Sequence, residues 1–197
     1  QDFERGAEGV VRAAAEALGS FPVFVKPCSS GSSVGVAKAA DMRELTEGLE
    51  AAFGYDSKVL VEEFISGHEI ECAVLGNLSP VASTVGEIAP AQEFYTFDAK
   101  YADEASKLFI PARITEEQLE ETRQNAIKVY TALGCRGLSR VDFFCTYDGG
   151  EIVFNELNAI PGFTSISMYP KLFAHSGVGY TELLDRLVTL ALEEHHG

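Results

Sequence analysis

Apolar residues recur at two spacings along this 197-residue chain, and each spacing predicts a different kind of element. In segment 3–18 they recur every three or four positions, which is typical of a helix that packs on a core, and Gly19 then ends the helix. Short apolar runs at 21–25 and 34–37 predict the two strands of a hairpin, which the polar loop 28–33 joins. The chain therefore opens with a helix followed by antiparallel strands.

A second helix is indicated by the residues at its start. Asp41 is a suitable N-cap, and Glu44 lies at the capping-box offset, so we expect a helix from here to about residue 53. An apolar strand follows at 59–62. The character of the chain changes around Ser66-Gly67, and we place a boundary between two subdomains there.

The middle of the chain combines a strand pair with an irregular segment. Two alternating strands at 69–86 turn at Gly76-Asn77. Segment 87–110 carries aromatic residues and mixed charge without a steady period, so it predicts a long loop, and loops of this length are usually functional. Thr115 is then a suitable N-cap for a helix that runs to about Leu133.

The last third of the chain predicts a hairpin and two helices. Strands are expected at 138–145 and 151–158, with a turn at Asp148-Gly149-Gly150. Two helices follow, at about 168–175 and 179–194. Strands and helices mixed in this way predict an α+β fold in which helices cover antiparallel sheets.

The boundary divides the chain into a first subdomain of residues 1–65 and a second of residues 66–197. Because 46% of the residues are hydrophobic, the chain is able to bury a sizeable core. The first residue is Gln1, and no strand precedes the first helix. We therefore expect the chain to be a piece of a longer protein.

The charge balance narrows the choice of partners. Asp and Glu number 30 against 15 Lys and Arg, which gives a net charge of -15. Phosphate backbones need a basic surface, so nucleic acid is not expected as a partner, although a few lysines and metal ions are enough to hold ATP. No apolar run is long enough to predict a membrane span, and no secretory signal is evident. These features predict a cytoplasmic protein.

The four cysteines are scattered and form no metal-binding or redox pair. Each lies in or next to an apolar run, so we expect buried thiols in a reducing compartment. The residues concerned are Cys28, Cys72, Cys135 and Cys145.

Two late strands carry the most specific chemical pattern. Side chains on a strand alternate between faces, so Arg140 shares a face with Asp142, and Glu156 shares a face with Asn158. If the strands pair through the turn at 148–150, three oxygen ligands and one guanidinium come together. Oxygen ligands suit Mg²⁺, which proteins usually hold through one or two carboxylates and substrate phosphates. The alternative is a solvated face with a surface salt bridge.

Three weaker patterns accompany this one, and each also has a plain structural explanation. Lys26 precedes a loop of Gly and Ser at 28–35, which suits phosphate binding or an ordinary hairpin turn. The strand that ends at Glu62 suits adenine and ribose binding or an ordinary sheet edge. In the long loop, Lys100-Tyr101 suits closure over phosphates or simple exposure to solvent.

Together these segments resemble the ATP-grasp superfamily and, within it, the D-alanine–D-alanine ligase family. The resemblance extends over nearly the whole chain in the order of the family. The matching segments are Val25-Lys26-Pro27 with Gly31 to Gly35; Val59 to Glu62 with Gly67 and Glu69; Ala99-Lys100-Tyr101; Gly134 to Gly137 leading into Arg140-Val141-Asp142; and Asn155 to Asn158 with Pro161 to Thr164.

The resemblance implies a role for each matched position. Nucleotide-binding roles fall on Lys26, Gly31, Ser32, Ser33, Glu62, Phe64, Ile65, Glu69 and Lys100. Metal-binding roles, for two Mg²⁺ ions or alternatively Mn²⁺, fall on Asp142, Glu156 and Asn158. Catalytic roles fall on Arg140, Lys100, Tyr101 and Ser32. Substrate-binding roles fall on Tyr101, Arg140, Gly162, Ser167 and Met168.

The implied reaction joins two D-alanines through an acyl phosphate for peptidoglycan precursor synthesis. Its small-molecule substrates are D-alanine and ATP. A homodimer is implied for the complete protein. Because the N-terminal domain of the family is missing, we expect this chain alone to be inactive.

Three alternatives are an ATP-grasp ligase with another acceptor such as D-serine or D-lactate, a non-catalytic nucleotide-binding domain, and a small-molecule kinase, for which no acceptor motif is present. In this sequence, Tyr101 and Ser167-Met168-Tyr169-Pro170 favour D-alanine as the acceptor.

Overall fold

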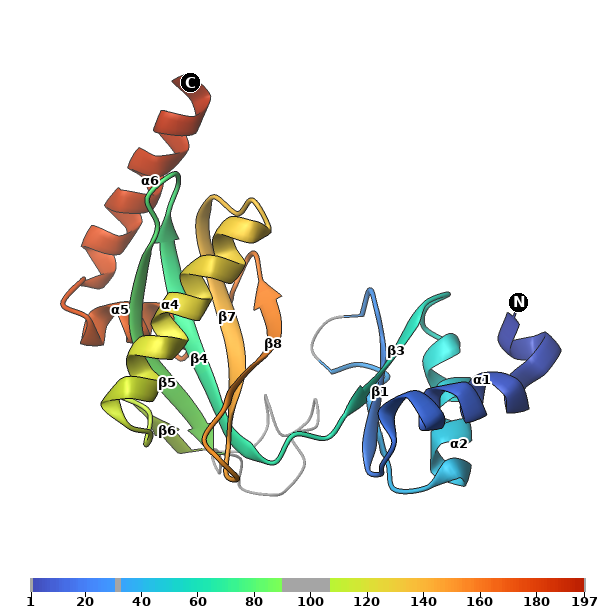
Figure 1. Ribbon diagram of the computed structural model, residues 1–197. Coiled ribbons are helices and arrows are strands. Elements are labelled where there is room, and N and C mark those ends of the chain that lie inside the picture. The colour runs from blue at the N-terminus through green and yellow to red at the C-terminus, as the bar shows by residue number, and fades with distance from the viewer. Residues whose placement is uncertain (1, 31–32, 90–106, 197) are drawn as a thin grey trace. The chain divides into compact units, whose positions relative to one another are not determined.

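The computed structural model describes residues 2–30, 33–89 and 107–196 (Figure 1). The chain divides into two compact units, and the division falls between Ile65 and Ser66. The first unit contains α1 (Asp2–Leu18), β1 (Val23–Pro27), β2 (Ala37–Ala39), α2 (Met42–Phe53) and β3 (Val59–Glu63). The second contains β4 (Gly67–Gly76), β5 (Val81–Ala89), β6 (Lys107–Phe109), α4 (Glu116–Ala132), β7 (Gly137–Thr146), β8 (Ile152–Asn158), α5 (Met168–His175) and α6 (Tyr180–His196).

The first unit is a three-stranded antiparallel sheet, in the order β2-β1-β3, with α1 and α2 on one face. Val23 and Val25 of β1 point to the helices and are buried with Leu45 and Leu49 of α2. Because side chains alternate along a strand, the residues between them point to the other face, where no helix of the described part of this unit packs.

The start of α2 confirms the cap predicted from the sequence. Asp41 accepts a hydrogen bond from the backbone N–H of Glu44, with 2.9 Å between Oδ1 and N. The Glu44 carboxylate in turn accepts from the backbone N–H of Ala40, at 2.8 Å. Two donors at the helix start are thereby satisfied, which fixes where the helix begins.

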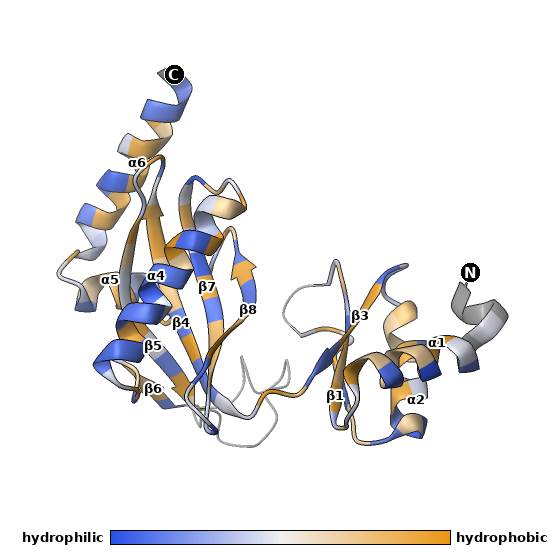
Figure 2. Cartoon of the chain, viewed as in Figure 1, coloured by the Kyte–Doolittle hydropathy of each residue, from blue (hydrophilic) through white to orange (hydrophobic). Residues whose placement is uncertain are grey.

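The second unit is built on a five-stranded antiparallel sheet in the order β6-β5-β4-β7-β8. On one face, α4 covers a core to which β4 contributes Ile70, Cys72 and Val74. On the other face, α5 and α6 cover the end of the sheet around Ala73 and Leu75. The side of α4 that is visible in Figure 2 is mostly hydrophilic, as expected for a helix that buries only its opposite face.

Capping and a buried hydroxyl hold α4 to the sheet. Thr115 and Gln118 form a capping box, in which each side chain bonds to the backbone N–H of the other residue. This confirms the predicted N-cap. The buried Tyr130 hydroxyl donates to the Gly76 carbonyl at the end of β4, with an oxygen–oxygen distance of 2.6 Å. Burial raises the pKa of Tyr130 to about 12, so the hydroxyl remains a donor at neutral pH.

The α+β fold with helices on antiparallel sheets is confirmed, and two local predictions were wrong. The apolar run 34–37 is largely a turn, and β2 begins only at Ala37, because Ser33 and Gly35 adopt positive φ angles. Within the segment expected to be one loop, β5 continues to Ala89, and Lys107–Phe109 forms β6 against it. A strand of three residues is too short to show a periodic pattern.

Two further expectations have mixed outcomes. Cys72 and Cys145 are buried as expected, but Cys28 is exposed and Cys135 is only half-buried, so the expectation of four buried thiols was wrong. All four cysteines are free thiols. Among the described residues, none of the helices combines the length and the apolar character that crossing a membrane requires.

Candidate functional site

Three carboxylates form a row across the five-stranded sheet, on the face that also carries α5 and α6. Asp142 of β7 lies directly opposite Glu71 of β4 on one side and Glu156 of β8 on the other. Like charges on directly opposed strand residues destabilise a sheet unless a cation lies among them. The row is therefore a place where positive charge is favoured.

Arg140 supplies a positive charge to this row. Its Nε and Nη2 donate to the two oxygens of Asp142, each at 2.7 Å. Its Nε also lies 3.2 Å from a Glu71 oxygen. Burial lowers the pKa of Arg140, but the Asp142 hydrogen bonds and the charges of Glu71, Asp142 and Glu156 outweigh burial and raise this pKa above its ordinary value. The guanidinium therefore carries a permanent charge.

Asn158 lies beside the same carboxylates. Its side-chain Nδ2 donates to Asp142 at 3.0 Å and to Glu156 at 3.3 Å. The structure thus brings together all four residues that the sequence placed on one face. In this arrangement the charge of Arg140 and the amide N–H of Asn158 compensate the negative charge of the carboxylates.

The donor set fits a hard divalent cation in its chemistry. Asp142 and Glu156 offer carboxylate oxygens, and Asn158 has an amide oxygen beside the Nδ2 that now faces them. Mg²⁺ is commonly held by one or two carboxylates together with substrate phosphates. Within the described ranges, no group of three or more His, Cys, Asp and Glu side chains converges as a metal cage. A cation here would accordingly depend on oxygens from a bound substrate as well as on the protein.

The open face of the three-stranded sheet holds other predicted residues. Lys26 Nζ lies 2.6 Å from a Glu62 oxygen, so these two candidates for nucleotide binding pair with each other. Phe64 follows β3, with its ring 6.0 Å from that of Phe24 and with Lys38 Nζ 4.2 Å above its centre. Two lysines and an aromatic ring on one uncovered surface suit a phosphate and a planar base.

The Gly/Ser loop of this unit is described only in part. Ser33 has a φ of 60°, and Gly35 has a φ of 76°. A Cβ on Gly35 would lie 2.8 Å from a Tyr55 ring carbon, so glycine is required there for both space and conformation. Gly31 and Ser32, to which the resemblance assigns phosphate contacts, lie outside the described residues.

The remaining predicted residues do not form one group. Glu69 is on β4, two positions before Glu71 and on the same face, whereas Ile65 is half-buried just before that unit. Gly162 lies so close to Ser167 that a Cβ would be 2.9 Å from its Oγ. Lys100 and Tyr101 lie outside the described residues.

Ser167 and Met168 stand at the start of α5 and differ in exposure. The Ser167 Oγ accepts from the backbone N–H of Thr164 at 3.0 Å and lies 2.9 Å from the Thr164 hydroxyl. Met168 as a whole is 5% exposed, and its side chain belongs to the core under α5. Of these two residues, Ser167 is therefore the more accessible to a substrate.

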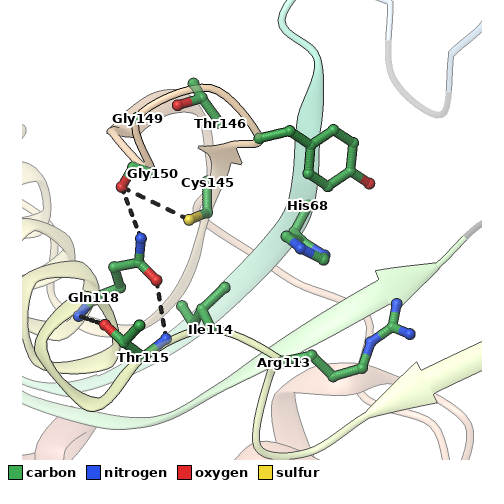
Figure 3. A pocket seen from close by; sticks show the side chains of 10 residues that line it. His68, Arg113, Ile114, Thr115, Gln118, Cys145, Thr146, Gly149 and Gly150 are labelled. Carbon is green, nitrogen blue, oxygen red and sulfur yellow. Dashed lines mark hydrogen bonds between the residues drawn. The ribbon is translucent and has the colours of Figure 1, made fainter.

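A hollow of about 460 Å³ lies elsewhere in the second unit, at the start of α4 (Figure 3). His68 and Cys145 line it together with Arg113 and Gln118. Since residues alternate along β7, Cys145 points to the α4 face, opposite to Asp142. The hollow and the carboxylate row are thus on opposite faces of the sheet.

Sequence reasoning missed two groups of charged residues. One is Glu71, which lacks a neighbouring motif but joins the carboxylate row through strand pairing. The other is the buried Glu87, which binds Arg113 and His68 beside the hollow. In both cases the sequence does contain a signal, because each Glu stands within a strand that is otherwise largely apolar.

Comparison with known proteins gives a consistent result. The family model described as "D-ala D-ala ligase C-terminus" matches residues 1–189. The chain is 55% identical over 189 residues to a D-alanine–D-alanine ligase of Acetivibrio thermocellus, covering 96% of this chain and 50% of that protein. It is 50% identical over 195 residues to a D-alanine–D-alanine ligase of Clostridium acetobutylicum, covering 99% of this chain and 57% of that protein. The chain thus spans about half the length of these curated relatives.

Solved structures agree with these relatives. The VanG D-Ala:D-Ser ligase from Enterococcus faecalis superposes with a TM-score of 0.84 at 42% identity, covering 94% of this chain and 53% of that one. The D-alanine–D-alanine ligase from Coxiella burnetii superposes with a TM-score of 0.79 at 37% identity, covering 96% and 50%.

Proposed function

Because the chain belongs to the D-alanine–D-alanine ligase C-terminal family, we propose that it is the ATP-binding part of a ligase that joins two D-alanines. The structural neighbours confirm the ATP-grasp fold. The observation that carries the proposal is the row of carboxylates, with Arg140 and Asn158 bound to its central member Asp142, because a scaffold has no need for so many charges on one face.

The two units would be the central and C-terminal subdomains of the fold, with residues 1–65 in the first and 66–197 in the second. In the first, Lys26 would bind the α- and β-phosphates of ATP. Glu62, which forms an ion pair with Lys26 in this structure, would instead bind the adenine. Phe64 and Ile65 would contact the base, and Ser33, together with Gly31 and Ser32, would cover the phosphates.

In the second unit, Glu69 would accept hydrogen bonds from the ribose hydroxyls. Asp142, Glu156 and Asn158 would hold the metal, with Mg²⁺ favoured over Mn²⁺ by its availability. The metal, when bound, neutralises phosphate charge that would otherwise repel the attacking carboxylate. For Asn158 to offer its oxygen, its amide must rotate away from the hydrogen bonds that Nδ2 now makes.

The proposed reaction has two steps. A carboxylate oxygen of the first D-alanine attacks the γ-phosphorus, and ADP leaves, which gives an acyl phosphate. The amine of the second D-alanine then attacks the acyl carbon, and inorganic phosphate leaves with the release of a proton. Arg140 would stabilise the negative oxygen of the tetrahedral intermediate, a role that suits its fixed charge.

Residues at the start of α5 and in the segment before it would select the acceptor. Ser167, Gly162 and Met168 would bind its carboxylate, and Lys100 and Tyr101 would contribute to the γ-phosphate and acceptor sites. The curated relatives at 50–55% identity are D-alanine–D-alanine ligases, which favours D-alanine as the acceptor. The solved structures do not separate the two acceptors, because the D-Ala:D-Ser ligase is 42% identical and the D-alanine–D-alanine ligase from Coxiella burnetii is 37% identical. The complete protein would be a cytoplasmic homodimer serving peptidoglycan synthesis.

Calorimetry of nucleotide binding tests the proposed site. The chain is titrated with ADP with and without Mg²⁺, and Glu156→Ala is compared with Glu151→Ala, which removes an exposed carboxylate just before the same strand. We expect Mg²⁺-dependent binding that the first variant loses and the second keeps. The full-length protein is then assayed for ADP release with D-alanine, D-serine and D-lactate. A full-length protein that neither binds the nucleotide nor releases ADP would contradict the proposal.

A further inference from the structure

Glu71 is the member of the carboxylate row to which the proposed function gives no role. Its side chain is almost buried, with 7% of the residue exposed, on the strand next to that of Arg140. One of its oxygens lies 3.2 Å from Arg140 Nε. Burying a carboxylate is costly unless a charge or hydrogen bonds compensate, so this position needs a reason.

The neighbours of Arg140 let its guanidinium reach Glu71. Ala73 lies directly opposite Arg140 in the β4–β7 pairing, and it is fully buried. Because its side chain is a single methyl group, the longer Arg140 side chain is able to lie across it toward β4. Glu71, two positions along the same strand, then comes within reach on the same face.

Arg140 has two carboxylate partners, and metal binding would affect them differently. Asp142 uses both oxygens for Arg140 in the present arrangement. In the proposed function, at least one of these oxygens would coordinate a cation, which weakens it as an acceptor. Glu71 lies on the other side of Asp142 from Glu156, away from the second proposed metal ligand.

We propose that Glu71 is a positioning residue that keeps the Arg140 guanidinium in place once Asp142 has turned to a metal ion. The inference rests on the proposed function, because it concerns how Arg140 meets the developing negative oxygen. Displacing a charged group by about 1 Å is enough to reduce a rate about 100-fold. A second carboxylate anchor thus preserves the geometry through the exchange of partners at Asp142.

Kinetics of the full-length protein test this role. Glu71→Gln removes the charge but keeps the size, Glu71→Asp keeps the charge on a shorter side chain, and Glu151→Gln is the control. We expect Glu71→Gln to lower kcat by about 10- to 100-fold with a much smaller change in KM for ATP, because Arg140 would act mainly in the transition state. Glu71→Asp should restore part of kcat, and the control should match the wild type.

A second measurement reports on Arg140 without relying on catalysis. Phenylglyoxal modifies accessible arginines, and mass spectrometry of the Arg140 peptide gives the rate at this one residue. In the presence of Mg²⁺ and ADP, Arg140 should react about tenfold faster in Glu71→Gln than in the wild type, which equals about 1.4 kcal/mol of lost restraint. Thermal melting curves show whether each variant is folded. If Glu71→Gln does not fold, the kinetics and the phenylglyoxal reactivity are both measured on Glu71→Asp.

The outcomes separate the two proposals. An active wild type with unchanged kcat and unchanged Arg140 reactivity in the Glu71 variants would overturn the positioning role alone. So would a rise in KM for ATP at constant kcat, because Glu71 would then act on nucleotide or metal binding. A wild type that binds no nucleotide and forms no ADP would refute the proposed function. The phenylglyoxal comparison in an Asp142→Ala background, where Asp142 no longer holds Arg140, would still show whether Glu71 restrains Arg140.

Discussion

Arg113 and Glu87 form a two-point ion pair although they are 26 residues apart in the chain. Nε and Nη2 of Arg113 donate to the two oxygens of Glu87, at 3.0 and 2.6 Å. The backbone N–H of Arg113 also donates to Glu87, at 3.0 Å, and His68 Nδ1 lies 2.8 Å from it. Burial raises the pKa of Glu87, but these hydrogen bonds outweigh burial and lower it to about 2.

Glu87→Gln should therefore destabilise the protein in a pH-dependent way. Because the folded pKa of about 2 lies below the ordinary value of 4.5, the contribution of Glu87 is complete above pH 4.5 and is lost as the pH falls toward 2. We expect a loss on the order of 3 kcal/mol at pH 7. Urea unfolding at pH 7 and pH 3 should show a smaller difference between variant and wild type at pH 3. A difference independent of pH would contradict the role of this charge.

Tyr130→Phe should lower stability without changing the fold. The variant loses the 2.6 Å hydrogen bond to Gly76 and leaves a buried carbonyl without that donor, which costs about 1–3 kcal/mol. Tyr147→Phe is the matched control, because Tyr147 is 67% exposed. Chemical denaturation followed by circular dichroism measures both, and equal stabilities of the two variants would argue against the hydrogen bond.

Gly67→Ala should destabilise the second unit through a clash between backbones. A Cβ at Gly67 would overlap the Cys145 carbonyl oxygen and lie 2.8 Å from its carbon, and a paired strand is unable to move aside. We expect a cost on the order of 3 kcal/mol. Gly9→Ala is the contrasting variant, because a Cβ in this exposed turn of α1 meets nothing within 4 Å. Because alanine has a higher helix propensity than glycine, Gly9→Ala should stabilise α1 by about 1 kcal/mol. Thermal unfolding measures this difference.

Lys26→Met should weaken nucleotide binding if Lys26 binds phosphates. Its Nζ now pairs with the single charge of Glu62, and the diphosphate of ADP offers a larger negative charge. We expect an affinity for ADP about tenfold lower, with a weaker dependence on salt, since one charge contact to phosphate is lost. Lys58→Met, which removes an exposed lysine next to β3, should bind as the wild type does. Equal affinities of the two variants would remove Lys26 from the site.

Much of the fold follows from local rules that the sequence displays directly. Asp41 and Thr115 mark the starts of helices because their side chains satisfy the first free N–H groups. The alternation along two strands places Arg140 with Asp142 and Glu156 with Asn158, because strand side chains have a period of two. A turn containing Gly149 and Gly150 joins these strands, so the four residues meet as expected.

Pairing between distant segments required the tertiary structure. Glu71 stands opposite Asp142 only because β4 and β7 pair in one register, and packing of the core under α4 selects that register. The same holds for β6 against β5 and for the ion pair of Glu87 and Arg113. The sequence by itself determined the elements and the faces along each strand, since these depend on neighbours in the chain. Only the tertiary structure decided which charges share a site, because the free energy of burying a common core sets how distant strands align.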